Sequence, residues 1–364
     1  MYLLNIKFFR YCVKFKSNVN NKKAKNINRE GIVFKIIDLR NNTFIWSETA
    51  PLPYFSLDFL KFSYFEILRF KQIIVSFTFL SWRRLFSNRN LFLKLSEEKI
   101  FPCLHCCITL GIYNLIRYRS KRLVNIRKTT TRLNSLVNFN LLLLNKENNL
   151  NTFNQFGNSV IKFKLRNLTF IDVFINFTFL VKYRNLCCSK KIRLDTNRTF
   201  SLEQNFYLFQ RLALHNLDYL EEPINQVRDV FALISELNCP TVLDELSRSF
   251  QSLAFDYSNL VGFVIKPSMM GSLRLILDLI NLNFLTYKFS ILSSIFETNC
   301  SVINFLLLLI DLDLNLPVGF GNSNSLIDDF IVSSQELSIR DGYLFLYLSK
   351  NVIVNIKEVV KLWF

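Results

Sequence analysis

Short apolar runs alternate with helical patterns along the central part of the chain. The runs are rich in β-branched or large apolar side chains, which is typical of strands buried on both faces of a parallel sheet. They cover residues 160–163, 192–194, 217–220, 241–243 and 262–265. The sequence therefore predicts a repeated strand–helix unit.

Helix signals fill the gaps between these runs. Ser201 with Gln204 three residues later forms a capping-box pattern, and an apolar stripe follows over residues 202–213. A second stripe covers residues 227–234 and a third covers residues 273–280. Stripes of this kind ordinarily belong to the hydrophobic core, so we expect these helices to pack against the strands.

An ionisable residue closes each of the five apolar runs, at intervals of roughly one strand plus one helix. These residues are Lys164, Asp195, Glu221, Asp244 and Lys266. In a barrel of parallel strands with outer helices, the residues that end successive strands meet at one face, where such enzymes place their chemistry. We expect two lysines and three carboxylates to share one site, the alternative being a set of surface salt bridges at loop tips.

The three carboxylates indicate a metal site. Carboxylates that point into one space repel one another unless they take up protons or a cation lies among them. A set of ligands made only of oxygen atoms suits Mg²⁺, with Mn²⁺ able to take its place. Neither His105 nor His215 nor any cysteine closes one of the runs, which argues against zinc.

The two lysines indicate acid–base chemistry. Lys162 and Lys164 are two residues apart on a predicted strand and therefore face the same way. Repulsion between their charges lowers the pKa of Lys164, which makes it a candidate neutral base, and Lys266 stands across the site. Two lysines beside a metal held by carboxylates favour removal of a proton next to a substrate carboxylate, through an enediolate.

Longer motifs contain these residues and carry a resemblance to a known family. They are EGIV at 30–33, ETAPLP at 48–53, FS at 55–56, KFK at 162–164, RLDTNR at 193–198, YLEEP at 219–223, LDE at 243–245, IKPS at 265–268 and SSIFE at 293–297. With this ordered set the chain resembles the o-succinylbenzoate synthases of the enolase superfamily, in its muconate-lactonizing-enzyme-like group.

The resemblance implies an α/β fold, a (β/α)7β TIM-like barrel with an α+β capping domain built from the N-terminal part and the C-terminal end. The capping domain would cover residues 1–100, with residues 325–364 returning to it, and the catalytic barrel residues 101–324. Residues 18–28 would lie where the family has a mobile loop over the active site.

The resemblance also implies roles for single residues. Asp195, Glu221 and Asp244 would bind Mg²⁺, with Glu221 preferred over its neighbour Glu222. Lys164 would take the proton alpha to the carboxylate and return it to the departing hydroxyl, while Lys266 would stabilise the enediolate from the opposite face. The supporting residues for the metal site or the substrate would be Lys162, Asn197, Ser293 and Ser294.

The implied reaction is dehydration of 2-succinyl-6-hydroxy-2,4-cyclohexadiene-1-carboxylate to 2-succinylbenzoate, in phylloquinone or menaquinone biosynthesis. The second candidate is an N-acylamino acid racemase or dipeptide epimerase of the same superfamily. Dipeptide epimerases tend to carry Asp-x-Asp after the eighth strand. Here Asp311 and Asp313 lie before the strand predicted near 316–318, at the end of a helix predicted over 302–310, which favours dehydration.

Composition sets the remaining expectations. A net charge of +17 opens a distant alternative, a basic RNA-associated protein that is not an enzyme. However, the basic runs are dispersed and no nucleic-acid motif accompanies them, so we expect a small-molecule carboxylate substrate as partner and no nucleic acid. No apolar stretch reaches the length of a transmembrane helix, and the chain could be a monomer or a homo-oligomer.

Codon bias and cysteine usage suggest a location. The 38 Phe and the scarcity of Gly (8) and Pro (7) are typical of an A/T-rich genome, which favours an organelle-encoded enzyme of the plastid (chloroplast) stroma, or else a bacterial cytoplasmic one. Among the eight cysteines, Cys103, Cys106 and Cys107 surround His105. We expect them to be buried reduced thiols and not a metal-binding knot.

Overall fold

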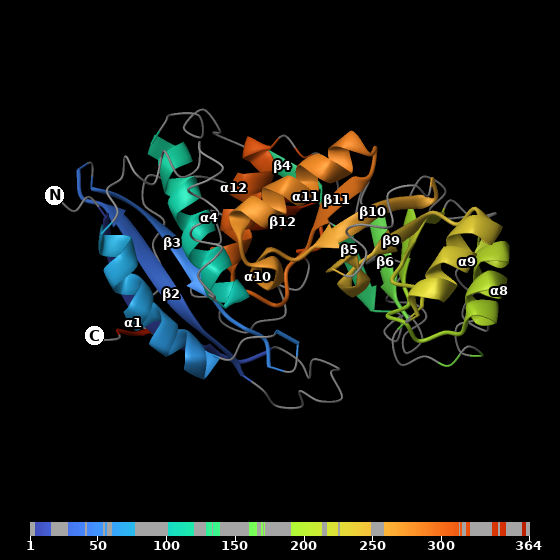
Figure 1. The fold of residues 1–364 in the computed structure, drawn as a ribbon, viewed down its shortest axis with the longest axis horizontal. Coiled ribbons are helices and arrows are strands. Elements are labelled where there is room, and N and C mark those ends of the chain that lie inside the picture. Colours follow the sequence, from blue (N-terminus) through green and yellow to red (C-terminus); the bar gives the residue numbers. More distant parts are fainter. Residues whose placement is uncertain are drawn as a thin grey trace.

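The structure is a computed structural model of the full chain. It describes residues 4–15, 28–40, 42–53, 55–56, 60–76, 101–119, 129–132, 134–138, 160–165, 169, 171, 191–212, 217–224, 226–248, 258–312, 314, 318–320, 337–340, 343–346 and 359–361. Figure 1 shows an antiparallel sheet with the helices α1 and α4 at one end of the molecule, and the helices α8 and α9 at the other.

The antiparallel sheet has the strand order β14-β1-β2-β3. Its strands are β1 (Leu4–Val13), β2 (Arg29–Asp38), β3 (Thr43–Thr49) and β14 (Val359–Lys361). Buried and exposed residues alternate along much of β1, whereas β2 is buried along most of its length. The sheet thus joins the two ends of the chain, since β14 pairs with β1.

Two helices flank this sheet (Figure 1). They are α1 (Leu60–Ser76) and α4 (Pro102–Arg119). Helix α4 is buried continuously over residues 103–115 because it packs between the sheet and the helices α10 and α12. A Cβ at Gly111 would lie 2.7 Å from Ile36 Cδ1 and 2.9 Å from Ser47 Cβ, so glycine is needed for this close approach of helix and sheet.

A seven-stranded parallel sheet forms the second part of the fold, with the order β11-β10-β9-β8-β7-β6-β5. Its strands are β5 (Asn134–Asn138), β6 (Val160–Lys164), β7 (Ile192–Asp195), β8 (Leu217–Glu221), β9 (Thr241–Leu243), β10 (Leu260–Ile265) and β11 (Phe289–Leu292). Each strand pairs with the next one along the chain, as the repeated strand–helix unit requires. A parallel bridge between Ser293 and Gly319 extends this order by one position.

From β7 onward, a helix follows each strand of this sheet in the part of the chain that the structure describes. These helices are α8 (Leu202–Leu212), α9 (Val227–Leu237), α10 (Pro267–Met270), α11 (Leu273–Leu285) and α12 (Asn299–Asp311), and a short 3-10 helix, η1, covers Glu245–Arg248. The predicted capping box is present, because the Ser201 N–H donates to Gln204 Oε1 (3.0 Å) and the Gln204 N–H donates to Ser201 Oγ (3.2 Å). The predicted helix stripes at 202–213, 227–234 and 273–280 therefore correspond to α8, α9 and α11.

A third, antiparallel sheet has the order β12-β13-β4. Its strands are β12 (Leu337–Arg340), β13 (Tyr343–Leu346) and β4 (Thr129–Arg132). Of the described strands after residue 324, β14 thus pairs with the N-terminal sheet, whereas β12 and β13 pair with β4. The domain boundaries given above stay a prediction.

One apolar core joins the N-terminal sheet to the barrel-like part. It contains residues of β1, β2, α4, α11, β11 and α12, and a second core lies among β6–β10, α8 and α9. The N-terminal sheet is therefore packed against the end of the parallel sheet through shared apolar side chains.

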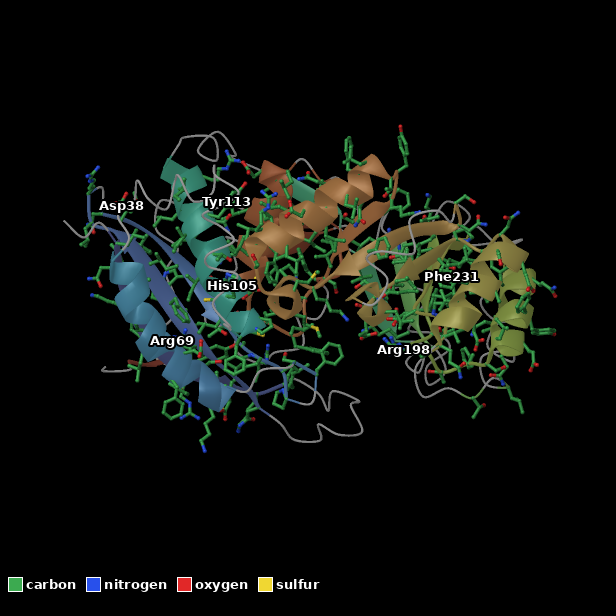
Figure 2. The ribbon with its side chains drawn as sticks, in the orientation of Figure 1. Asp38, Arg69, His105, Tyr113, Arg198 and Phe231 are labelled. Atoms are coloured by element: carbon green, nitrogen blue, oxygen red, sulfur yellow. The ribbon has the colours of Figure 1, made fainter. Side chains whose placement is uncertain are left out.

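The cysteines of α4 are buried, as expected. Cys103, Cys106 and Cys107 form no disulfide with any cysteine that the structure describes, and burial raises the pKa of the Cys106 and Cys107 thiols. Burial also lowers the pKa of His105 to about 4, and its Nε2 has no hydrogen-bond partner among the described residues. Figure 2 shows His105 on α4. Among the described helices, none combines the length and apolar character needed to cross a bilayer.

His105 predicts an acid-dependent loss of stability. A base whose folded pKa is depressed stabilises the fold above its unfolded pKa, and that stabilisation is lost as the pH falls through the folded value. Between pH 7 and pH 4.5 we expect His105 to lower the free energy of unfolding by roughly 2 kcal/mol. Urea unfolding of the wild type and of His105→Leu at both pH values measures this contribution. An equal pH dependence in the two proteins would contradict it.

Candidate active site

Backbone register brings the charged strand ends together. Lys164 is paired with Asp195 across β6 and β7, and Asp195 is paired with Glu221 across β7 and β8. Asp244 and Lys266 each follow directly after the last residue of β9 and β10. All five predicted residues therefore lie at the carboxyl ends of five consecutive parallel strands.

Two ammonium groups contact the three carboxylates. Lys162 Nζ lies 3.0 Å from Asp195 Oδ2 and 2.7 Å from a Glu221 carboxylate oxygen. Lys266 Nζ lies 2.5 Å from Asp244 Oδ2. All three carboxylates are buried, so these ion pairs compensate charges that would otherwise be costly to bury.

Lys164 differs from the other two lysines. Burial lowers its pKa, and the positive charge of Lys162 lowers it further, against the pull of Asp195 and Glu221. For Lys162 and Lys266 the effect of the neighbouring carboxylates exceeds that of burial, so their pKa values are raised. Of these three lysines, Lys164 thus loses its proton most easily. Burial is a larger cause of its lowered pKa than the repulsion from Lys162 that the sequence indicated.

The carboxylates also act on one another. Burial, opposed by Lys162 and reinforced by the charges of Asp195 and Asp244, raises the pKa of Glu221 to about 7. Burial likewise raises the pKa of Asp244. The pKa of Asp195 is lowered because Lys162 and Lys164 together outweigh its burial. Burial therefore keeps Glu221 and Asp244 closer to their neutral forms than free carboxylic acids, and a bound cation would favour their ionised forms.

Asn197 orients the carboxylate of Asp195. Its backbone N–H donates to Asp195 Oδ1 (3.2 Å), and its side-chain amide donates to the same oxygen. Asn197 has a φ of 45°, in the left-handed region that asparagine tolerates better than most residues. The supporting position predicted for Asn197 thus adjoins the candidate metal ligand.

Ser293 and Ser294 join β11 to the segment 318–320. The Ser293 N–H donates to the Ile265 carbonyl (2.9 Å), and its hydroxyl donates to the Gly319 carbonyl (3.1 Å). The Ser294 N–H donates to the same Gly319 carbonyl (3.1 Å). These contacts stabilise the end of β11. A role of both serines in substrate binding stays a prediction.

Glu222 has a structural role that the sequence did not indicate. Its carboxylate is fully buried and accepts hydrogen bonds from the backbone N–H of Asp244 (2.7 Å) and of Leu246 (3.0 Å). It also accepts from Arg198 Nε (2.7 Å), a residue labelled in Figure 2. Glu222 therefore anchors the segment that carries Asp244, while Glu221 contacts the lysine at the site.

Phe55 is a second residue that the sequence assigned no chemical role. Its ring centroid lies 5.0 Å from Lys266 Nζ, which is cation–π range. Phe55 belongs to the segment that follows β3, so the N-terminal part of the chain contributes to this end of the barrel-like sheet. The predicted lid at 18–28 lies, apart from residue 28, outside the described residues.

The donor set fits a hard divalent cation. The three carboxylates offer oxygen atoms from neighbouring strands, the kind of donor that Mg²⁺ prefers, and the Lys162 ammonium lies as a cation between two of them. Within the described part of the chain, no three Asp, Glu, His or Cys side chains are grouped as a metal site as they stand, since these carboxylates are turned toward lysines. A metal ion would have to replace the lysine contacts.

Comparison with known proteins gives the fold. No family model and no curated protein matches the chain. MenC from Desulfotalea psychrophila LSv54 matches with a TM-score of 0.73 and 16% identity over 94% of this chain and 99% of that one. The L-Ala-D/L-Glu epimerase from Bacillus subtilis matches with a TM-score of 0.77 and 11% identity over 95% and 96%.

The chain has the fold of the enolase superfamily. A member of that superfamily from Roseovarius nubinhibens ISM, complexed with magnesium, matches with a TM-score of 0.74 and 13% identity over 98% of this chain and 97% of that one. This fold comprises a TIM-like barrel and a capping domain, to which the parallel and the antiparallel sheet correspond. At such low identity the likeness gives the architecture and not the reaction.

Magnesium should stabilise the folded protein if these carboxylates hold it. A ligand present at about 100 times its Kd adds about 2.7 kcal/mol to the free energy of unfolding, which for a chain of this length corresponds to a rise in Tm of roughly 3 to 4 °C. Scanning calorimetry with and without MgCl2 measures the shift in the wild type and in Asp244→Asn, where we expect it to vanish.

Asp218→Asn is the matched control for that experiment. Asp218 lies near the opposite end of β8 and pairs with Lys191 and Arg193, so its loss should leave the magnesium shift intact. A shift of equal size in Asp244→Asn and Asp218→Asn would place the ion elsewhere.

Proposed function

We propose that the protein is an o-succinylbenzoate synthase, a hydro-lyase that converts 2-succinyl-6-hydroxy-2,4-cyclohexadiene-1-carboxylate to 2-succinylbenzoate in phylloquinone or menaquinone biosynthesis. One observation carries the proposal: Lys164, whose pKa is lowered, is paired in register with Asp195 beside two further carboxylates and Lys266. The motif resemblance supports the same reaction, and the fold shared with MenC is compatible with it.

Lys164 would perform the proton transfers. Its neutral amine takes the proton from the carbon alpha to the substrate carboxylate, and an enediolate forms. The electron pair then returns to form the new carbon–carbon double bond while the carbon–oxygen bond to the ring hydroxyl breaks. Lys164 gives its proton to that hydroxyl, so water leaves and the ring becomes aromatic. A base with a pKa near the working pH suits both steps.

Lys266 and the carboxylates would manage the negative charge of the enediolate. Lys266 stays protonated because Asp244 and Glu245 raise its pKa, and it would face the charge that develops on the substrate carboxylate. Asp195, Glu221 and Asp244 would hold Mg²⁺. That ion would supply further positive charge to the substrate carboxylate.

Racemisation or epimerisation of acylated amino acids is the second candidate, because an epimerase shares the fold and both lysines could act as bases. Asp311 does not support it. Asp311 ends α12, pairs with Arg117 (3.1 Å) and accepts a hydrogen bond from the Tyr113 hydroxyl, so it holds α12 to α4 and not a substrate ammonium group. Asp313 lies outside the described residues.

The A/T-rich composition continues to favour a plastid-encoded enzyme, with a bacterial enzyme as the alternative. Both compartments are compatible with the buried thiols of α4, which form no disulfide with another described residue.

Replacing the two lysines tests the assigned roles. We expect Lys164→Ala to lower kcat for the dehydration by roughly 10³-fold or more, because it removes the general base. Lys266→Ala should lower kcat by roughly 10²- to 10³-fold through lost charge stabilisation. Absorbance-monitored turnover of the cyclohexadiene substrate measures both, with exposed Lys191→Ala as the control. Near wild-type turnover of Lys164→Ala would refute its role.

A substrate panel separates the two candidate functions. Turnover of the cyclohexadiene substrate is compared with α-proton exchange of N-acylamino acids and dipeptides in D2O, followed by NMR. We expect kcat/KM for dehydration to exceed exchange of every panel member by at least roughly tenfold, a difference of about 1.4 kcal/mol in transition-state binding. The reverse order would assign the protein to the racemases or epimerases.

A further inference from the structure

Arg29 is a buried cation outside the ring of charged strand ends. It is the first residue of β2 and is only 1% exposed. Its guanidinium donates to three backbone carbonyls: Nε to Phe296 (2.8 Å), Nη1 to Pro51 (3.1 Å) and Nη2 to Ala50. A single side chain of β2 therefore ties together two other segments that are far apart in the sequence, one at residues 50–51 and one at Phe296.

The first of these segments leads to Lys266. After Ala50 and Pro51 the chain turns, and the N–H groups of Phe55 (3.1 Å) and Ser56 (2.9 Å) donate to the Leu52 carbonyl. This turn places the Phe55 ring over Lys266 Nζ. By binding the carbonyls of Ala50 and Pro51, Arg29 thus fixes the start of the segment whose Phe55 ring lies over Lys266.

The second segment follows Ser293 and Ser294. Phe296 has a φ of 65°, a left-handed conformation that is unfavourable for a bulky residue. The Arg29 contact to its carbonyl holds the chain in this conformation. The next residue, Glu297, is buried and accepts a hydrogen bond from the Ser268 hydroxyl, and Ser268 is two residues beyond Lys266. Arg29 therefore holds the backbone on both sides of Lys266: the segment that carries Phe55, and the segment that carries Glu297, which contacts Ser268.

The charge of Arg29 is compensated locally. Burial raises the pKa of Glu297, and Arg29 opposes that rise. Glu48 lies in the same cluster, where it accepts hydrogen bonds from Tyr11 and from the N–H (3.2 Å) and hydroxyl (2.8 Å) of Thr298. A lysine could keep the charge at position 29, but its single ammonium cannot reproduce a fork that reaches three carbonyls.

We propose that Arg29 is a positioning residue for Lys266. It fixes the 50–56 segment so that the Phe55 ring shields the Lys266 ammonium, and it fixes the 293–298 segment on the other side. The shielding does not depend on which reaction the protein catalyses. Its catalytic consequence, a precise placement of Lys266 against the substrate, rests on the proposed function.

The accessibility of Lys266 tests the proposal directly. Folded protein is treated briefly with acetic anhydride, and the acetylation rate of Lys266 is measured by peptide mass spectrometry relative to exposed Lys191. We expect Arg29→Lys and Phe55→Leu each to raise this relative rate about threefold or more, the factor that corresponds to an exposed cation–π contact. The double variant should be no faster than the faster single variant, because both changes remove the same shield.

Arg10→Lys is the matched control. Arg10 lies on the neighbouring strand β1, is half exposed and pairs with Glu30 (3.1 Å), so its replacement should leave the Lys266 rate unchanged. Circular dichroism and Tm establish that each variant is folded at the labelling temperature. A variant that only loosened the fold would raise labelling at many lysines, whereas the proposal requires a change confined to Lys266.

Two results would overturn the proposal. One is an unchanged acetylation rate of Lys266 in Phe55→Leu. This result can be obtained even if the Arg29 variants do not fold. The other is a double variant whose effect is the product of the two single effects, since independent contributions would show that Arg29 does not act through Phe55. If the wild-type protein had no dehydratase activity, the proposed function alone would be refuted. The labelling result would be unaffected.

Discussion

The register of the parallel strands is the constraint on which the candidate site depends. Hydrogen bonds between strand ends fix it: Leu165 N–H donates to the Asp195 carbonyl (2.8 Å), and Glu222 N–H donates to the Val242 carbonyl (2.9 Å). A slip of one residue would turn a charged side chain to the other face of the sheet. The chemistry proposed here therefore rests on backbone pairing before it rests on any side-chain contact.

Charge compensation is the second requirement. Three carboxylates buried at one end of a sheet need cations, and in this structure Lys162 and Lys266 supply them. The same lysines would have to release carboxylate oxygens when a divalent ion binds. A separate buried cluster, with Arg29 among Glu48 and Glu297, joins the N-terminal sheet to the loop after β11. Ion pairs thus organise both the site and its cover.

Local sequence patterns predicted the elements well and the distant contacts poorly. The apolar runs that end in Lys164, Asp195 and Glu221 form β6, β7 and β8, because burial on both faces selects short apolar strands. The contact between Arg29 and Phe296 joins residues 267 positions apart, and no periodicity reports such a contact. The spacing of Lys162 and Lys164 indicated repulsion, but the ion pairs of Lys162 with Asp195 and Glu221 became visible only in three dimensions.

The position of a bound metal ion tests the central claim most directly. Crystals grown with MnCl2 would give an anomalous difference map that locates the ion without reference to activity. The account predicts one peak within coordination distance of oxygens from Asp195, Glu221 and Asp244, with the Lys162 ammonium moved out of contact with at least one of them. A map without a peak among these carboxylates, with Lys162 still paired to Asp195 and Glu221, would contradict it.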